Sequence, residues 1–265
     1  VIAPARPAAF RILMQMETGD AHSDEVLRSP EVDALSAVDR HLTTTLVLGT
    51  LRWQLALDAQ IRSLLARPDV KLSPEAATAL RMGAYQLLHL DRVPAHAVLH
   101  DSVELVKHGN ERGAAGMVNA VLRKIQRIGD SGQRTEQQRS AFSDQRSEML
   151  RTAGEIAARW AHPGWMVERW ARRYGLEAAE SICRWDQEPA PLAVRAESHE
   201  GLAGLDTEPG AFLACARRVV SGEVGRTEAF RAGRIRIQDG GSQLVAEVLA
   251  GRADEGPVRV LDRCA

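Results

Sequence analysis

The spacing of apolar residues in the first half of the chain limits the fold most strongly. From Ala8 to Ile128 they recur every three or four positions, without the alternation typical of half-buried strands. Ser36 and the pair Ser73-Pro74 are typical helix N-termini, and Gly109 and Gly129 are typical helix ends. The pattern predicts an all-α bundle of about six or seven helices.

The second half has a different pattern. Helical periodicity resumes within residues 156–185, and short β-type segments follow at 192–195, 218–220 and 234–237. Residues 242–249 predict a helix, and 258–261 predict a buried parallel strand. The chain is therefore expected to be multi-domain: a helical bundle at 1–128, a polar linker at 129–150, an α/β segment at 151–256, and the first strand of a further domain at 257–265.

Composition excludes several classes of site. The 34 Lys+Arg and 35 Asp+Glu residues give a net charge of −1, so any nucleic-acid contact must come from local patches. Cys183, Cys215 and Cys264 form no CxxC pair, and no zinc or other metal site is predicted. No apolar stretch approaches the ~18 residues of a membrane helix, and the opening residues ValIleAlaProAlaArgPro lack the apolar region of a signal peptide. A cytoplasmic protein without membrane contact is expected.

Three clusters of basic residues are candidates for RNA contact, since guanidinium groups bind phosphate oxygens well. The alternative is that each is only the solvated face of an element, and Glu168 and Glu177 are available to neutralise the second cluster. The clusters are Arg123, Lys124 and Arg127; Arg169, Arg172 and Arg173; and Arg217 with Arg218.

Other side chains leave two interpretations open. Trp165, Trp170 and Trp185 either stack on unpaired bases or, as is commoner on amphipathic helices, pack in the core. Arg52 either contacts RNA or forms a buried salt bridge with Asp39 or Asp58, and the salt bridge is favoured. The histidines are interpreted as capping or packing residues; they are His89, His96, His100 and His108.

Several strings resemble one family in the same order along the chain. They are GlyThrLeuArgTrp (49–53), LeuArgMetGlyAlaTyrGlnLeuLeu (80–88), ValProAlaHis (93–96), SerValGluLeuValLys (102–107), ValAsnAlaValLeuArg (118–123), HisProGlyTrpMetValGluArgTrp (162–170), IleGlnAspGlyGlySerGln (237–243) and ValLeuAspArgCysAla (260–265). Together they resemble the bacterial 16S rRNA cytosine-C5 methyltransferases of the RsmB, Fmu or Sun type. The resemblance implies a NusB-like RNA-binding bundle, an α/β segment, and the start of a Rossmann-like methyltransferase domain.

The resemblance also implies a cofactor, S-adenosyl-L-methionine (AdoMet). The last string is similar to the start of the family's glycine-rich AdoMet turn, which makes Asp262, Cys264 and Ala265 candidate cofactor contacts, while Arg263 departs from the pattern. Asp262 is alternatively a helix N-cap, and Cys264 a packed apolar residue.

The string IleGlnAspGlyGlySerGln has two interpretations. Gln238, Asp239, Ser242 and Gln243 shape the entrance to the cofactor site, or Asp239 or Ser242 only caps the following helix.

No catalytic residue is assigned in this chain. The family's two cysteines follow proline or threonine, and neither Cys183 nor Cys215 has such a neighbour. Because the AdoMet turn stops after its first alanine, the chain is expected to be the RNA-binding and positioning part of such an enzyme, inactive alone, with small-subunit rRNA as partner.

Two alternatives remain. One is a stand-alone NusB-like RNA-binding or antitermination module, against which the residues after Ile128 count. The other is a cytosine-C5 methyltransferase with another RNA substrate, since resemblance in fold does not determine a substrate. The sequence does not determine which cytosine is modified or the oligomeric state.

Overall fold

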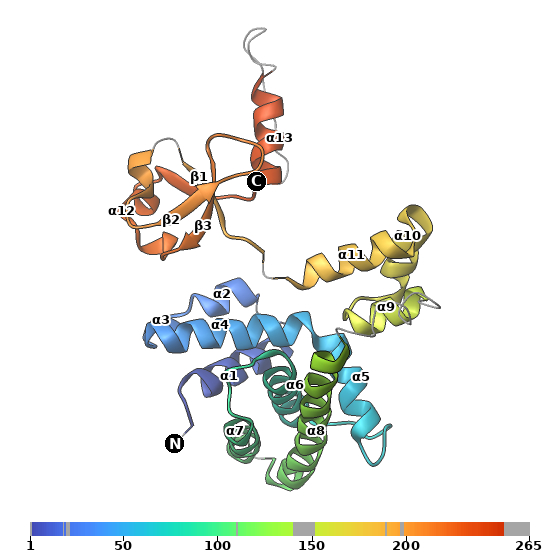
Figure 1. Ribbon diagram of the computed structural model, residues 1–265. Helices are drawn as coiled ribbons and strands as arrows, with labels where there is room; N and C mark the ends of the chain where they lie inside the picture. Colours follow the sequence, from blue (N-terminus) through green and yellow to red (C-terminus); the bar gives the residue numbers. More distant parts are fainter. Residues whose placement is uncertain are drawn as a thin grey trace. The chain divides into compact units, whose positions relative to one another are not determined.

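The computed structural model describes residues 2–17, 19, 22–109, 111–139, 152–188, 190–196 and 199–251. It divides into two compact units, Val1–Glu188 and Pro189–Ala265. Figure 1 shows helices throughout the first unit and a small sheet in the second. Each unit is described separately below.

The first unit begins with the predicted all-α bundle. Its elements are α1 (Ala5–Glu17), α2 (Ser23–Leu27), α3 (Pro30–Asp33), α4 (Ala37–Arg52), α5 (Gln54–Leu64), α6 (Pro74–His89), α7 (Ala95–His108), the 3₁₀ turn η1 (Arg112–Ala114) and α8 (Ala115–Arg139). The predicted N-caps are confirmed: the Ser36 hydroxyl accepts from the Asp39 amide, and the Ser73 hydroxyl accepts from the Ala76 amide. These contacts satisfy backbone donors that a helix start leaves free.

Helix α6 forms the centre of the bundle and packs against α1, α4, α5, α7 and α8. Leu80 and Met82 on α6, and Leu122 on α8, are fully buried. Close packing requires a glycine on α4, because a Cβ at Gly49 would overlap the ring of Tyr85. The buried stripes of these helices therefore form one continuous core.

Helix α8 does not end at Gly129 as the sequence predicts. It continues to Arg139, so part of the expected linker 129–150 is helical. A Cβ at Gly129 would lie 3.3 Å from the backbone oxygen of Leu87 on α6. The glycine thus permits close approach of two helices instead of ending one, and its propensity cost of about 1 kcal/mol is small enough for the helix to continue.

Three further helices belong to the same compact unit: α9 (Ala153–Arg159), α10 (Gly164–Tyr174) and α11 (Leu176–Gln187). All three are predicted by the helical periodicity. They enclose a second core that includes Ile156, Val167 and Cys183. Helix α9 also contacts α5, and the rings of Trp53 and Trp160 have centroids 6.3 Å apart. The boundary between the two compact units therefore falls at Glu188, later in the chain than the boundary expected at 129–150.

The second unit is built on a four-stranded antiparallel sheet of order β2-β3-β1-β4. Its elements are β1 (Ala193–Ala196), η2 (His199–Leu202), β2 (Asp206–Pro209), β3 (Ala216–Ser221), η3 (Val224–Arg226), α12 (Glu228–Arg231), β4 (Ile235–Ile237) and α13 (Gly240–Ala250). The three predicted strands and the predicted helix are confirmed. Strand β2 was missed, since its sequence AspThrGluPro is polar and ends in proline, as edge strands permit.

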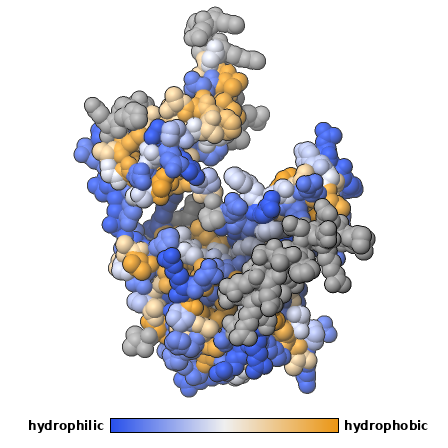
Figure 2. All heavy atoms as spheres, viewed as in Figure 1, coloured by the Kyte–Doolittle hydropathy of each residue, from blue (hydrophilic) through white to orange (hydrophobic). Residues whose placement is uncertain are grey.

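The core of the second unit lies on one face of this sheet. Val194 and Ala196 on β1 and Ile235 on β4 are buried there with residues of η2, η3 and α12. Helix α13 leaves Val245 and Val248 exposed, and Figure 2 shows apolar surface in orange at this helix. The expected parallel strand at 258–261, with the rest of 257–265, lies outside the described residues.

Candidate nucleic-acid interface

The first basic cluster does not form one surface. Arg123, Lys124 and Arg127 are all exposed on α8. Arg123 lines a groove next to α7, whereas the Lys124 ammonium donates to the backbone oxygen of Leu64, 2.9 Å away at the end of α5. A cation at the last carbonyl groups of a helix stabilises that end. Lys124 therefore has a structural role in joining α8 to α5.

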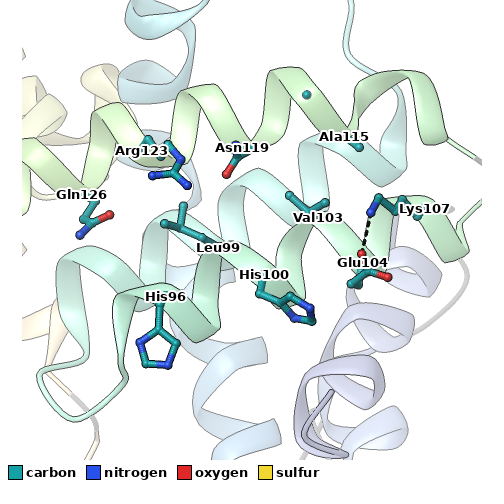
Figure 3. A pocket seen from close by; sticks show the side chains of 11 residues that line it. His96, Leu99, His100, Val103, Glu104, Lys107, Ala115, Asn119, Arg123 and Gln126 are labelled. Atoms are coloured by element: carbon teal, nitrogen blue, oxygen red, sulfur yellow. Dashed lines mark hydrogen bonds and ion pairs between the residues drawn. The ribbon is translucent and has the colours of Figure 1, made fainter. Parts of the chain in front are cut away.

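The groove between α7 and α8 has a volume of 720 Å³ (Figure 3). Apolar side chains, including Leu99 and Val103, lie beside polar ones from both helices. Figure 3 shows Arg123 extending from α8 towards Leu99 on α7. Local sequence patterns do not predict this groove, because its two walls come from two helices whose lining residues are about twenty positions apart.

Charge in the groove is partly neutralised. Lys107 and Glu104 form an ion pair of 2.7 Å, and the hydrogen bond from Lys107 lowers the pKa of the Glu104 carboxyl. Within the described part of the chain, Arg123 forms no ion pair with a carboxylate. Asn119 and Gln126 add amide groups that donate or accept hydrogen bonds. The groove thus offers an anion one guanidinium and two amides.

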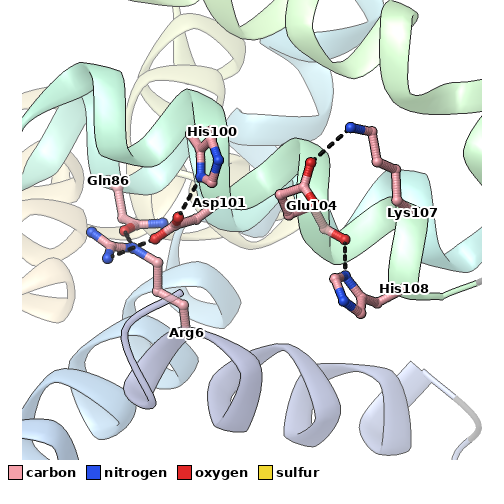
Figure 4. A network of polar contacts seen from close by, with 7 residues as sticks. All are labelled: Arg6, Gln86, His100, Asp101, Glu104, Lys107 and His108. Atoms are coloured by element: carbon pink, nitrogen blue, oxygen red, sulfur yellow. Dashed lines mark hydrogen bonds and ion pairs between the residues drawn. The ribbon is translucent and has the colours of Figure 1, made fainter. Parts of the chain in front are cut away.

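A buried polar network lies next to this groove (Figure 4). Arg6 on α1 donates to Gln86 Oε1 over 2.8 Å and to Asp101 Oδ2 over 3.0 Å. The other carboxylate oxygen of Asp101 lies 3.0 Å from Nδ1 of His100, which lines the groove. The network ties α1 to α6 and α7 and positions His100. Sequence reasoning missed it, and the one available signal was a charged residue within the otherwise apolar face of α1.

The second basic cluster lies on α10. Arg169, Arg172 and Arg173 are exposed, while Val167 on the same helix is fully buried. The expected neutralisation is not found: among the described residues, none of the three arginines pairs with Glu168 or Glu177. Arg172 and Arg173 belong to the last turn, where positive charge also favours the helix dipole. The cluster remains available for phosphate.

The tryptophans divide between the two interpretations. Trp170 packs against the core of α9–α11, and its ring centroid lies 5.8 Å from that of His162. Trp165 and Trp185 are 64% and 67% exposed, so the expectation of core packing is wrong for both. Helical periodicity gave no reason to separate them, since each follows the same three-to-four spacing. Exposed indoles beside arginines are the chemistry that binds unpaired bases.

The predicted salt bridge of Arg52 is wrong. Asp58 instead accepts two hydrogen bonds from Arg81, of 2.6 and 2.9 Å, and Arg81 also pairs with Glu17. The Asp39 carboxylate accepts a hydrogen bond from the Ser36 hydroxyl, and the Asp39 amide donates to the Ser36 hydroxyl oxygen; both bonds belong to the helix start. Among the described residues Arg52 makes no ion pair. Burial raises the pKa of the Tyr85 phenol, and the positive charge of Arg52 opposes this shift.

The packing role predicted for His89 is confirmed. Its ring stacks on Trp53, with centroids 4.3 Å apart, and on Tyr85, with centroids 5.4 Å apart. Burial lowers the pKa of His89, because the charged imidazolium loses its hydration. His96 and His100, in contrast, line the groove.

Polar residues at the start of α13 act as a helix cap. The Asp239 carboxylate accepts from the Ser242 amide over 3.0 Å, which confirms the capping alternative, and the bonds from Ser242 lower the pKa of Asp239. Gln243 is buried and donates to the backbone oxygen of Gln238 over 2.8 Å.

The thiols in the described residues are unsuited to nucleophilic chemistry. Cys183 is fully buried, and burial raises the pKa of its thiol. Cys215 is half-buried, and its thiol lies 3.9 Å from Oε1 of Gln243. The third cysteine, Cys264, and the other two candidate cofactor contacts, Asp262 and Ala265, lie outside the described residues.

The described residues include neither a metal-ligand cluster nor a membrane-spanning helix. No group of three or more His, Cys, Asp or Glu side chains could hold a metal ion there. No helix in this part of the chain has the length and apolarity needed to cross a membrane.

Two family models match the chain. The NusB family matches residues 3–127, and the ferredoxin-like domain of RsmF/B-like methyltransferases matches residues 162–201. The first match covers the bundle, and the second covers α10, α11 and β1.

Curated relatives match almost the whole chain. A probable ribosomal RNA small subunit methyltransferase B of Bacillus subtilis (strain 168) is 34% identical over 271 residues, covering 98% of this chain and 57% of the relative. A protein of the same name from Synechocystis is 29% identical, with 98% and 58% covered. The chain thus spans less than two thirds of the length of these relatives.

A solved structure shares the fold. The crystal structure of PH0851 matches with a TM-score of 0.64 at 16% identity, covering 94% of this chain and 56% of that one. The chain thus carries a NusB-family region followed by an RsmF/B-type ferredoxin-like region, and along 98% of its length it is similar to proteins named ribosomal RNA small subunit methyltransferase B.

Proposed function

We propose that this chain is the RNA-binding and RNA-positioning part of an AdoMet-dependent methyltransferase that acts on cytosine C5 of small-subunit rRNA. The observation that carries the proposal is the order of a NusB-family domain and an RsmF/B-type ferredoxin-like domain along one chain. The relatives that share this order over 98% of the chain are named as methyltransferases of small-subunit rRNA.

The exposed surface of α10 and α11 supplies chemistry suited to single-stranded RNA. Arg169, Arg172 and Arg173 provide exposed positive charge that no carboxylate among the described residues neutralises, and Trp165 and Trp185 provide exposed aromatic faces. Cations that contact phosphates hold the strand, while aromatic rings stack on bases that have left a helix. An enzyme that must reach an atom within a stacked base needs such a surface.

The helical bundle is proposed to make further RNA contacts through Arg123 and Arg127. Arg123 is an exposed cation in the groove between α7 and α8, where the other one, Lys107, is paired with Glu104. Lys124, the third residue predicted in this cluster, is proposed to support RNA binding indirectly, because its contact with the end of α5 holds α8 in place.

Methyl transfer itself requires groups that the described residues do not provide. AdoMet supplies the methyl group when bound, and Asp262, Cys264 and Ala265 are the proposed contacts for it. The buried thiol of Cys183 and the half-buried thiol of Cys215 are not suited to attack a base. We therefore expect these 265 residues alone to bind RNA without methylating it, in the cytoplasm where rRNA is processed.

Two assays test the proposal. Anisotropy with labelled, unpaired fragments of small-subunit rRNA should show binding by this chain that weakens steeply with salt. The protein as the cell makes it, supplied with AdoMet, should methylate small-subunit rRNA at C5 of cytosine, read out by bisulfite sequencing. Binding without methylation would favour an RNA-binding module, and methylation only of another RNA would change the substrate. Absence of both would refute the proposal.

A further inference from the structure

The sheet of the second unit has a second, polar face. Val194 and Ala196 on β1 point into the core, so Arg195 between them points away from it. The register pairs Arg195 directly with Arg236 on β4, and both arginines are exposed. Two guanidinium groups therefore extend from the same face of neighbouring strands.

Among the described residues, this pair of arginines lacks the side-chain partners that the arginines of β3 have. Arg218 on β3 pairs with Glu208 on β2, and Arg217 donates to Thr207 over 3.3 Å. Among the described residues, neither Arg195 nor Arg236 forms an ion pair. Like charges directly opposite each other destabilise a sheet, so the pair has an electrostatic cost that a bound anion would remove.

Protection of an exposed sheet edge accounts for only one of the two charges. Strand β4 is an edge strand, where a charged residue such as Arg236 discourages pairing with other chains. Strand β1 lies between β3 and β4 and has no open edge. Arg195 therefore needs another explanation.

The two arginines line a hollow of 460 Å³ together with Arg234, Gly233 and Gln238. Gly233 has a φ of +74°, and a Cβ there would lie 3.3 Å from Nη2 of Arg236. The glycine thus leaves room for the Arg236 guanidinium beside the turn before β4. Arg234 adds a third cation, whose contact with the exposed Glu228 is long at 3.4 Å.

We propose that Arg195 and Arg236 together bind a phosphate group in this hollow, with Arg234 at its border. Guanidinium groups donate paired hydrogen bonds to phosphate oxygens, and one anion between two arginines would replace their repulsion by attraction. The site shares no residue with the clusters on α8 and α10. That the phosphate belongs to an RNA backbone rests on the proposed function.

The test compares the chain with its Arg195→Gln/Arg236→Gln variant in binding a labelled single-stranded rRNA fragment over a range of salt concentrations. Losing two phosphate contacts should lower the slope of log K against log salt by about 1.4. Arg218→Gln, on the same sheet but paired with Glu208, is the matched control and should leave the slope unchanged. The double variant should melt no lower than the parent chain, because it removes a repulsion.

A second arm separates this inference from the proposed function. Inorganic phosphate is titrated into the parent chain while the NMR signals of the arginine Nε–H groups are recorded, assigned with the two single variants. Shifts confined to Arg195 and Arg236 support the site even if the chain binds no RNA, which would refute the proposed function alone. An unchanged salt slope with phosphate binding would overturn the RNA backbone as the source. No shift and no change in slope would overturn the site.

Discussion

Replacing Arg6 by methionine should destabilise the helical bundle by about 3–5 kcal/mol, the usual cost of removing one partner of a buried ion pair. The side chains of Arg6 and Asp101 are each 8% exposed. Without Arg6, the contact with His100 is the one that the Asp101 carboxylate keeps among the described residues, and Gln86 Oε1 loses its donor in a side chain that is 1% exposed. An unsatisfied neutral acceptor costs about 1–3 kcal/mol, and the uncompensated charge adds to this.

The assay is urea unfolding of the whole chain followed by circular dichroism, with the double variant Arg6→Met/Asp101→Leu as the comparison. The double variant removes the stranded charge and should recover all but the cost at Gln86, about 1–3 kcal/mol. Arg11→Met on the same helix breaks an exposed pair with Glu31 and should cost about 0–1 kcal/mol. A loss below about 1 kcal/mol for Arg6→Met, or a double variant as unstable as the single one, would refute the reasoning.

Three further predictions follow from the packing of aromatic residues. Gly49→Ala should destabilise the bundle by about 1–3 kcal/mol in urea unfolding, because its Cβ overlaps Tyr85; a neutral result would mean that the helices separate easily. Burial lowers the pKa of His89 in the folded chain, so the unfolded chain binds a proton at this imidazole more readily than the folded one. The free energy of unfolding should therefore be highest above the unfolded pKa of about 6.5 and should fall as the pH decreases below it. His89→Phe should flatten this dependence in melts at pH 5–7.5, and an equally steep loss in the variant would exclude His89 as its cause. Trp165→Ala should weaken binding of unpaired RNA by about 1–3 kcal/mol per stacked base without lowering the melting temperature, whereas Trp170→Ala should lower the melting temperature; equal RNA binding by the Trp165 variant would rule out stacking there.

Local signals in the sequence predicted most of the elements. Ser36 and Ser73 mark helix starts because a hydroxyl satisfies an amide three residues later, a contact that depends on neighbours in the chain alone. Alternation and β-branched residues likewise located three of the four strands. The order of the family strings identified the domain types for the same reason, since such strings are contiguous in sequence.

Contacts between distant residues were not predictable in this way. Gly129 has the local signature of a helix end, yet α8 continues because the glycine lies against the backbone of α6. The sequence suggested Arg52 as a partner of Asp58, but the packing of α5 on α6 pairs Asp58 with Arg81.

The candidate site shows the same division. Composition and helical spacing indicated that arginines and tryptophans cluster in this chain, but the tertiary structure decided which of them remain exposed. Lys124 is bound to the end of α5, Trp170 is packed, and Trp165 is exposed. Arg195 and Arg236 are 41 positions apart in the sequence, and the register of β1 against β4 brings them together. Residue type sets what a side chain can bind, whereas its availability depends on neighbours that long-range packing brings to it.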